Sequence, residues 1–345
     1  MSIVSSRHRQ RVLRLNPPYS LVQPDGLSRD LLKSPVPALL RGSFVYAYLD
    51  RGAVLGYVQA KPRWQRRDEW TICTLALSDR APDDVLEGLL EEVCRSAGEQ
   101  GVMRIFVKVP QDEPSLEWFR HLGFTHYTNE LIWGKLYFGP SSAQGDEPPY
   151  KPLRRAVHRD AWDLMKLYST VTPPAVQRAE LLNSRQWQGN RLVRPWPFGG
   201  NLVERSYVWP DESESKGGLG GYVRLLTGAR GHWISLLFKG DPDNRRVMSS
   251  AFDYVLWKAA RRGNKPVYCG VRQYQADLGG DLESRGFHLL SEQVLMVKYL
   301  AEPIQARQHA LLPFLVPKGS EMVVSKFTAT GGTPIANKWT IDDGR

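Results

Sequence analysis

The chain has 345 residues, 42% of them hydrophobic and 24% charged, which is typical of globular proteins and long enough for two domains with separate cores. Its net charge of +10 is uneven: residues 1–67 carry +9, residues 68–138 carry −7 and residues 231–299 carry +3. No apolar run approaches the ~20 residues that cross a bilayer, and the chain opens without the apolar stretch of a secretory signal. We therefore expect a cytoplasmic protein that does not bind membranes.

Strand and helix patterns alternate through the first half of the chain. Alternating apolar residues predict strands over 44–49 and 53–60, around a tight turn at 50–52. A strand, a helix, a strand, a short helix and a strand are then expected at 70–77, 85–100, 104–109, 116–122 and 128–136. The preceding stretch, 8–43, is short and rich in proline, so opening helices are expected to be eroded there.

A segment rich in turn-forming residues at 139–151 has no periodicity and predicts an interdomain linker. The second half is predicted to contain a strand, two helices, three strands, a helix, a strand, a short helix and a strand, at 153–157, 159–169, from 173, 205–209, 219–226, 232–238, 247–262, 267–271, 277–285 and 292–299. The tail at 301–345 has one strand-like stretch, 321–328.

The two halves repeat one another. Phe124 and Phe287 stand 163 positions apart, as do Trp70 and Trp233, and the Gly-Tyr-Val at 56–58 matches that at 221–223. Offsets that change only by loop-sized amounts indicate a duplicated domain and not a short solenoid repeat. The predicted boundaries are an N-terminal domain at 1–138, the linker, a C-terminal domain at 152–300 and an extension at 301–345.

A short motif closes the last helix of each copy: WFRHLGF at 118–124 and LESRGF at 282–287. Together with the element order, this motif resembles the GCN5-related N-acetyltransferase family over roughly 40–138 and 151–300. The resemblance implies a mixed α/β fold of two tandem domains, each a central mixed sheet flanked by helices. It also implies transfer of an acyl group from acetyl-CoA to an amine, the acceptor being a small molecule or a peptide.

In this family a loop between the fourth strand and the long helix holds the pyrophosphate of acetyl-CoA, using backbone N–H groups at the helix start. The first copy has Pro82, Asp83 and Asp84 there, which fit helix capping better than phosphate binding. The second copy has Met248 where the family has glycine, but it keeps basic and small residues nearby. The resemblance therefore implies a cofactor site in the second copy, at Leu237, Phe238, Lys239, Arg245, Arg246 and Ser250.

The family's general acid is often a tyrosine four residues before the glycine of the Gly-Phe pair, but Phe119 and Leu282 stand at these positions. Tyr274 is the candidate acid from a different position. A general base, where the family has one, lies on the fourth strand, at Glu69 and His232 in the two copies. Since a histidine takes up a proton near neutral pH, His232 is the candidate base.

The charge distribution favours the second copy as the cofactor site, because a polyanion binds poorly beside the net negative charge of the first. We expect the first copy to be structural. Two alternatives stay open: a non-catalytic scaffold with both sites degenerate, and a nucleic-acid-binding protein that uses residues 1–67. Arg63, Arg66 and Arg67, with Trp64, are typical of a phosphate and stacking patch, but equally of a solvated hairpin end.

Three cysteines, Cys73, Cys94 and Cys269, lie singly in apolar segments, without the spacing of a zinc site. We expect them to be reduced and buried. The seven histidines show no metal-ligand spacing either, so no metal cofactor is expected.

Overall fold

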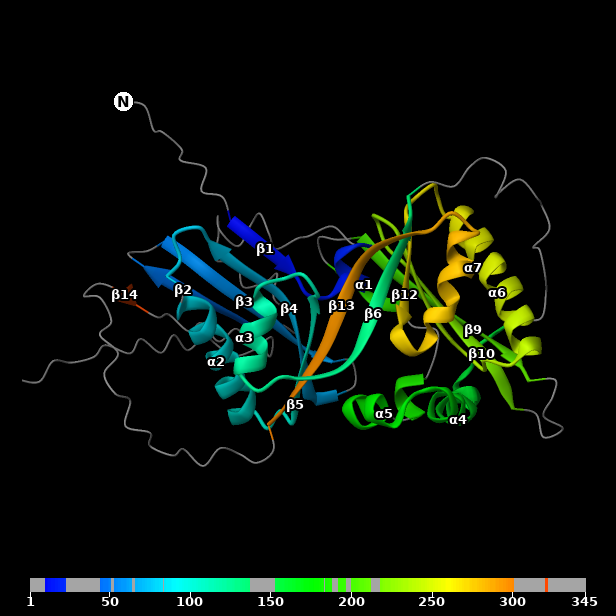
Figure 1. The fold of residues 1–345 in the computed structure, drawn as a ribbon, viewed down its shortest axis with the longest axis horizontal. Coiled ribbons are helices and arrows are strands. Elements are labelled where there is room, and N and C mark those ends of the chain that lie inside the picture. The colour runs from blue at the N-terminus through cyan, green and yellow to red at the C-terminus, as the bar shows by residue number, and fades with distance from the viewer. Residues whose placement is uncertain are drawn as a thin grey trace, which may run out of the picture. The chain divides into compact units, whose positions relative to one another are not determined.

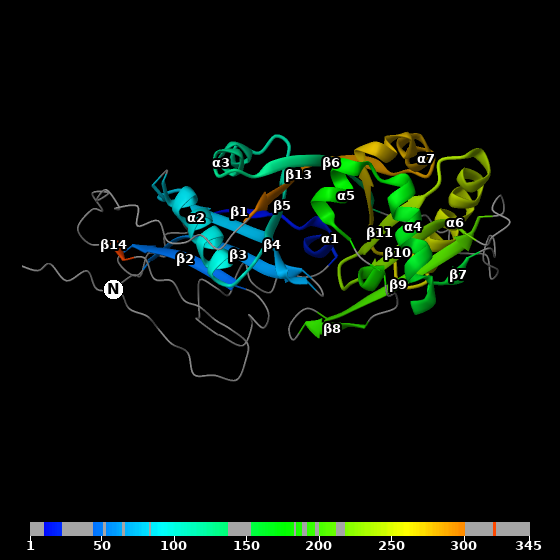
Figure 2. The ribbon, with the colours of Figure 1, turned by 90° about the horizontal axis from the view of Figure 1, so that it is seen from below.

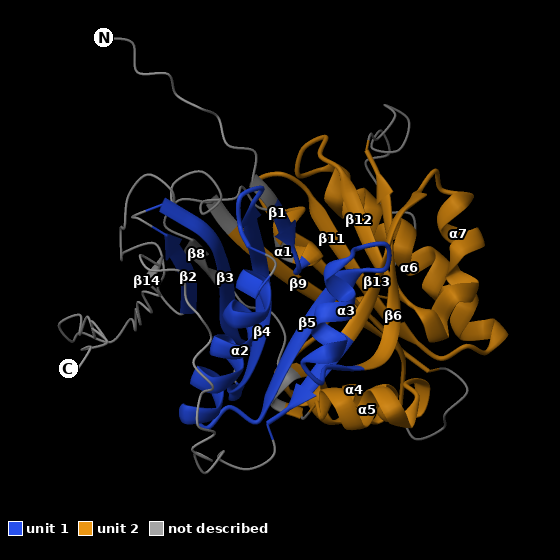
Figure 3. Ribbon diagram, turned by 60° about the vertical axis from the view of Figure 1, so that its left-hand side comes forward, with its two compact units in different colours: residues 1–16, 27–125, 296–345 blue, residues 17–26, 126–295 orange. Residues whose placement is uncertain are grey.

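Two sets of mainly antiparallel strands, each containing one parallel pair, form the framework of the chain in a computed structural model (Figure 1). The structure describes residues 10–22, 44–50, 53–63, 66–82, 84–136, 153–182, 184–187, 192–196, 200–211, 218–300 and 320–321. They fall into two compact units, coloured separately in Figure 3: unit 1 takes residues 1–16, 27–125 and 296–345, and unit 2 takes 17–26 and 126–295. The predicted linker at 139–151 and most of the predicted strand at 321–328 lie outside the described residues.

In the residues that the structure describes, unit 1 is a mixed sheet with two helices. Its elements are β1 (Gln10–Arg14), β2 (Phe44–Asp50), β3 (Ala53–Arg63), β4 (Arg66–Ser78), α2 (Asp84–Glu99), β5 (Arg104–Pro110), α3 (Ser115–His121) and β14 (Ser320–Glu321). The strand order is β14-β2-β3-β4-β5, and β1 pairs with β4. Helix α2 packs on β2 and β3, where Tyr46 Oη donates to Ser96 Oγ at 2.8 Å. Strands β4 and β5 are parallel, starting at the pair Glu69 and Arg104.

Unit 2 has the same core order with further elements. These are α1 (Pro17–Ser20), β6 (Thr125–Lys135), β7 (Arg154–Arg155), the 3₁₀ helix η3 (His158–Asp160), α4 (Ala161–Val171), α5 (Pro174–Glu180), η4 (Ser184–Trp187), β8 (Leu192–Trp196), β9 (Gly200–Pro210), β10 (Leu219–Thr227), β11 (His232–Phe238), α6 (Pro242–Ala260), β12 (Val267–Arg272), η5 (Gln273–Leu278), α7 (Gly279–Glu283) and β13 (His288–Tyr299). The strand order is β13-β6-β12-β11-β10-β9-β7, with β11 and β12 parallel.

Helices cover both faces of the sheet in unit 2 (Figures 1 and 2). On β10 and β11, Tyr222 and Leu237 belong to a buried cluster with α4, whereas the neighbouring Val223 and Leu236 belong to a cluster with α6. This is the alternation expected of strand side chains. It gives the sheet an α4–α5 face and an α6 face.

The predicted duplication is visible in the backbone of both units. The parallel pair begins at Glu69 and Arg104 in unit 1 and at His232 and Val267 in unit 2, positions offset by 163 in each strand. Both short helices also end in the same cap, in which Gly123 and Gly286 have φ of +80° and +76°.

In these caps the N–H of the following phenylalanine donates to the carbonyl five residues earlier, at 2.9 Å for Phe124 and 3.1 Å for Phe287. This is the Schellman arrangement, which needs a glycine because other residues resist a positive φ. The predicted fold class, with two units that are each a mixed sheet with packed helices, is therefore confirmed.

The last strands do not follow the sequence repeat. Strand β6, which follows the Gly-Phe pair of the first copy, pairs antiparallel with β12 in unit 2, with Glu130 opposite Arg272. Strand β13, which follows the second Gly-Phe pair, has its residues 296–299 in unit 1. The compact units and the sequence copies thus divide the chain differently, and the predicted domain boundaries stay a prediction.

Other elements differ from the expectation in extent. Helix α6 begins at Pro242 and not at residue 247, because Asp241 caps it and a proline is accepted in a first turn. Strand β1 was not expected at the front of the chain. The three cysteines are buried and unpaired, as predicted. Among the described residues, every helix is too short or too polar to traverse a lipid bilayer.

The close approach of Trp209 to Gly221 gives a test of the packing in unit 2. A Cβ atom added to Gly221 would lie 1.9 Å from Cζ2 of the fully buried Trp209 ring. We expect Gly221→Ala to lower the free energy of unfolding by about 1–3 kcal/mol, the usual cost of overpacking. The control is Gly280→Ala in α7, where an added Cβ meets nothing within 4 Å. Urea unfolding of both variants measures the difference, and equal midpoints would contradict this packing.

Candidate active site

Strands β11 and β12 are paired only at their beginnings. The parallel register runs from His232 with Val267 to Ser235 with Gly270, whereas the strands continue to Phe238 and Arg272. Beyond the register, Gln275 Nε2 donates to the carbonyl of Leu236 at 3.4 Å. The two strands therefore separate toward their carboxyl ends, and side chains from η5 reach the space beside them.

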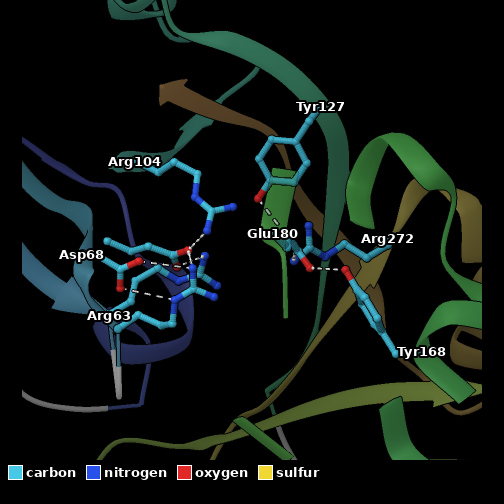
Figure 4. Close-up of polar contacts among 9 residues, drawn as sticks. Arg63, Asp68, Arg104, Tyr127, Tyr168, Glu180 and Arg272 are labelled. Atoms are coloured by element: carbon cyan, nitrogen blue, oxygen red, sulfur yellow. Dashed lines mark hydrogen bonds and ion pairs between the residues drawn. The ribbon is translucent and has the colours of Figure 1, made fainter. Parts of the chain in front are cut away.

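A buried ion cluster lies at the end of β12, on the α4–α5 face (Figure 4). Arg272 Nε lies 3.2 Å from Glu130 Oε1, and Arg272 Nη2 lies 3.0 Å from Glu180 Oε1. Glu130 comes from β6 and Glu180 from the last turn of α5, and both are buried. Gly270 lies close to both Trp233 and Glu130, since an added Cβ would lie 2.5 Å from Cζ2 of the Trp233 ring and 3.3 Å from the Glu130 carboxylate. One guanidinium thus faces two carboxylates.

Tyrosine hydroxyl groups complete the cluster. Tyr168 Oη donates to Glu180 Oε2 at 3.1 Å, and Tyr127 Oη reaches Glu180 Oε1 at 3.5 Å. Burial raises the pKa of Tyr168 and of Tyr274, and the carboxylate of Glu180 adds to this effect. Burial works against the charge of Arg272, but Glu180 and Glu130 outweigh it and raise its pKa. At neutral pH both phenols are therefore protonated and the guanidinium is charged.

The two candidate catalytic residues are not brought together. Tyr274, in η5, interacts electrostatically with Arg272 and lies beside Thr172, on the α4–α5 face. His232 begins β11, two residues before Ile234, whose side chain packs with α6. Since residues two apart on a strand share a face, the His232 imidazole lies on the α6 face, whereas Tyr274 lies on the α4–α5 face. It is fully buried, with Nδ1 at 3.0 Å from Thr227 Oγ1. Burial, with Lys265 nearby, lowers the pKa of His232 to about 4.

The candidate cofactor residues lie around the start of α6. Leu237 and Phe238 are buried on opposite faces of the sheet, and Lys239 Nζ is 2.6 Å from the buried carboxylate of Asp211. Asp241 accepts hydrogen bonds from the N–H of Asn244 and from its side chain, both at 2.9 Å, so this carboxylate caps the helix.

Arg245 and Arg246 belong to the first turns of α6, not to the loop before it. Arg245 pairs with Asp277, and Arg246 with Asp243 at 3.5 Å, and all four side chains are exposed by 42% or more. Ser250 lies one turn on, where its hydroxyl donates to the Arg246 carbonyl at 3.4 Å. Ion pairs this exposed are weak and can exchange partners. The two guanidinium groups are therefore the members of the set whose chemistry fits a pyrophosphate.

The corresponding positions of unit 1 differ in charge. Glu69, which aligns with His232, is fully buried and contacts Arg63, Arg66 and Arg104. Asp84 stands in the first turn of α2, as a helix-stabilising acid, and Asp83 lies outside the described residues. No group of three or more His, Cys, Asp and Glu side chains in the described ranges is placed to hold a metal ion.

Sequence reasoning missed the cluster of Glu130, Glu180 and Arg272. The available signal was a charged residue directly after the apolar run of β12, and a glutamate at the end of an amphipathic helix. Neither says which carboxylate meets which guanidinium, because the partners come from β6, α5 and β12, up to 142 positions apart.

No family model and no curated protein matches the chain. Solved structures with a similar arrangement include a GCN5-related N-acetyltransferase from Sphaerobacter thermophilus, with 13% identity over 72% of this chain and 78% of that one, at a TM-score of 0.41. A tandem GNAT protein from the clavulanic acid biosynthesis pathway has 12% identity over 75% and 84%, at 0.44. A GNAT-family acetyltransferase from Colwellia psychrerythraea has 9% identity over 74% and 85%, at 0.37.

Likeness at this level transfers no residue role to this chain. Its fold class follows from its own strand order and paired registers.

The buried imidazole of His232 predicts a pH dependence of stability. In the unfolded chain the histidine takes up a proton below pH ~6.5, but in the folded chain only near pH 4. The unfolded state therefore binds more protons between these values, and stability falls by up to about 1.4 kcal/mol for each pH unit lowered in this window. Urea unfolding at pH 7, 6 and 5 should show a smaller fall for His232→Asn, which cannot titrate. Parallel pH profiles of variant and wild type would contradict the assignment.

Proposed function

We propose that unit 2 transfers an acyl group from acetyl-CoA or a related acyl-CoA to an amine, and that unit 1 has no catalytic role. The observation that carries the proposal is the surplus carboxylate in the buried cluster of Glu130, Arg272 and Glu180. It lies at the separating ends of β11 and β12, next to buried tyrosine hydroxyl groups.

The cluster favours a cationic acceptor. The carboxylates of Glu130 and Glu180 and the guanidinium of Arg272 together carry a net charge of −1, and both carboxylates are buried. An ammonium group that enters the site is attracted to these two carboxylates. The proposal therefore names a primary amine, on a small molecule or a peptide, as the acceptor.

The amine must lose a proton before its nitrogen can act as a nucleophile. In this proposal Glu180 accepts the proton, because its carboxylate is ionised and lies at the ends of the separating strands; the contacts from Tyr127 and Tyr168 orient it. The proposal assigns to Tyr274, whose pKa burial raises so that its phenol is protonated, the donation of a proton to the departing sulfur atom. His232 faces away from this site, so the proposal gives it a structural role.

An acyl-CoA, when bound, supplies an acyl carbonyl activated as a thioester. Arg245 and Arg246 would hold its phosphate groups, because their guanidinium groups are exposed and their present partners are exposed carboxylates. Asp241 opposes this binding, since its carboxylate stands at the start of α6.

The second candidate function is a non-catalytic binding protein. Two observations favour it: the carboxylate of Asp241 occupies the N-terminus of α6, and Lys239 is held by the buried Asp211. Both reduce the positive potential available to a pyrophosphate. This alternative predicts that acetyl-CoA neither binds nor reacts.

Replacing Glu180 tests the proposed chemistry. In Glu180→Gln the side chain keeps its size but loses the charge that accepts a proton. With acetyl-CoA and a panel of primary amines, we expect the rate of free thiol release to fall by about 100-fold or more. The matched control is Asp163→Asn on α4, whose exposed carboxylate pairs only loosely with Lys166, at 3.8 Å. Equal rates in Glu180→Gln and wild type would refute the role of Glu180.

Replacing the arginines tests the cofactor site independently. Titration calorimetry of the full chain with acetyl-CoA should show binding that the double variant Arg245→Ala/Arg246→Ala weakens by about tenfold or more, since charge-assisted hydrogen bonds to phosphate are lost. The control is Arg120→Ala, an exposed arginine of α3 paired with Glu117. If millimolar acetyl-CoA gives no heat and no thermal stabilisation of the wild type, the proposed cofactor site is refuted and the non-catalytic alternative is favoured.

A further inference from the structure

Three arginines converge on one buried carboxylate in unit 1 (Figure 4). Arg63 Nη1 at the end of β3 lies 3.2 Å from Glu69 Oε2, and Arg66 Nη2 on β4 lies 2.7 Å from Glu69 Oε1. Arg104, the first residue of β5, contacts the same oxygen, Oε1. The parallel pairing of Glu69 with Arg104 fixes this geometry, because the two residues are register partners.

The cluster has more positive than negative charge. The strongest charged neighbours of Glu69 and of Arg104 belong to one group of five side chains: the three arginines, Glu69 and Asp68. Asp68 is half exposed and lies 3.4 Å from Arg66, so solvent screens it, whereas the Glu69 side chain is fully buried. These five side chains together carry a net charge of +1.

Burial makes this surplus costly. The exposed fraction of the Arg104 side chain is 5%, and burial lowers the pKa of its guanidinium despite the charge of Glu69. Burial likewise raises the pKa of the Glu69 carboxyl, against the effect of the three arginines. A buried cation that shares one carboxylate with two others gains from an additional anion.

Arg63 gives access to the cluster. Its side chain is 26% exposed and its guanidinium lies 4.2 Å from the centre of the Phe106 ring, which holds it in place. Among the described residues, its buried Nη1 atom has no hydrogen bond of good geometry, although Glu69 is within ion-pair distance. The exposed part of the Arg63 side chain is where an acceptor oxygen of a ligand approaches the positively charged cluster.

We infer that the cluster of Arg63, Arg66 and Arg104 is a binding site for a small oxyanion, a phosphate or a carboxylate group of a ligand. Guanidinium groups bind both through parallel N–H donors, which is why arginine is preferred for such ligands. Glu69 orients the arginines and competes with the anion for them. This site is in unit 1 and is separate from the transfer that we propose for unit 2.

Opposite effects of two substitutions test the site. Titration calorimetry of the full chain is performed with inorganic phosphate and with acetate, against chloride at equal ionic strength. We expect phosphate or acetate to bind the wild type, Arg63→Gln to weaken this binding about tenfold, and Glu69→Gln to tighten it, because the competing charge is removed. The preferred probe identifies whether the ligand group is a phosphate or a carboxylate.

A control locates the bound anion. Arg120→Gln removes an exposed arginine of the same unit that pairs with Glu117, and it is expected to bind the probe like the wild type. If Glu69→Gln fails to fold, Arg63→Gln still tests the site, since Arg63 is the most exposed of the three arginines. The inference is overturned if the wild type binds neither probe, or if Arg63→Gln binds the probe as tightly as the wild type does.

Discussion

A charged group removed from water must meet an opposite charge, and this constraint organises the interior of both units. In unit 1 the carboxylate of Glu69 is surrounded by arginines, and in unit 2 the guanidinium of Arg272 is held by Glu130 and Glu180. The charges of these side chains sum to a positive value in the first cluster and to a negative value in the second. The proposed ligands, an oxyanion and an amine, follow from the sign of the remaining charge.

The same backbone frame supports both clusters. A parallel strand pair begins at equivalent residues in the two units, and the same glycine cap ends the short helix that follows. Glu69 and His232 therefore occupy equivalent positions in the two units, but their surroundings differ. Glu69 contacts three arginines, whereas His232 contacts Thr227. Duplication preserved the frame, while the buried polar residues diverged.

Elements with strong local signals could be predicted from the sequence. Strand alternation and the Gly-Phe caps placed nearly all core elements, because these features depend on neighbouring residues. The start of α6 was wrong because the cap formed by Asp241 with Pro242 was not recognised as a helix start. The pairing of β6 with β12 was missed since strand partners are decided by tertiary contacts that periodicity does not encode.

The candidate site was predictable only in part. The sequence pointed to Tyr274, which lies beside Arg272 on the α4–α5 face. It also pointed to His232, which lies on the α6 face because strand residues alternate between faces. Glu180 was not anticipated, because its importance comes from partners on other elements. A single residue pattern cannot show that a carboxylate will be buried against a distant arginine.

The central claim is that unit 2, and not unit 1, is the site of acyl transfer. A crystal structure of the full chain soaked with acetyl-CoA tests it most directly. The account predicts electron density for the thioester between the separating ends of β11 and β12, with its phosphates beside Arg245 and Arg246. Density for the cofactor in unit 1, or none in either unit at a saturating concentration, would contradict it.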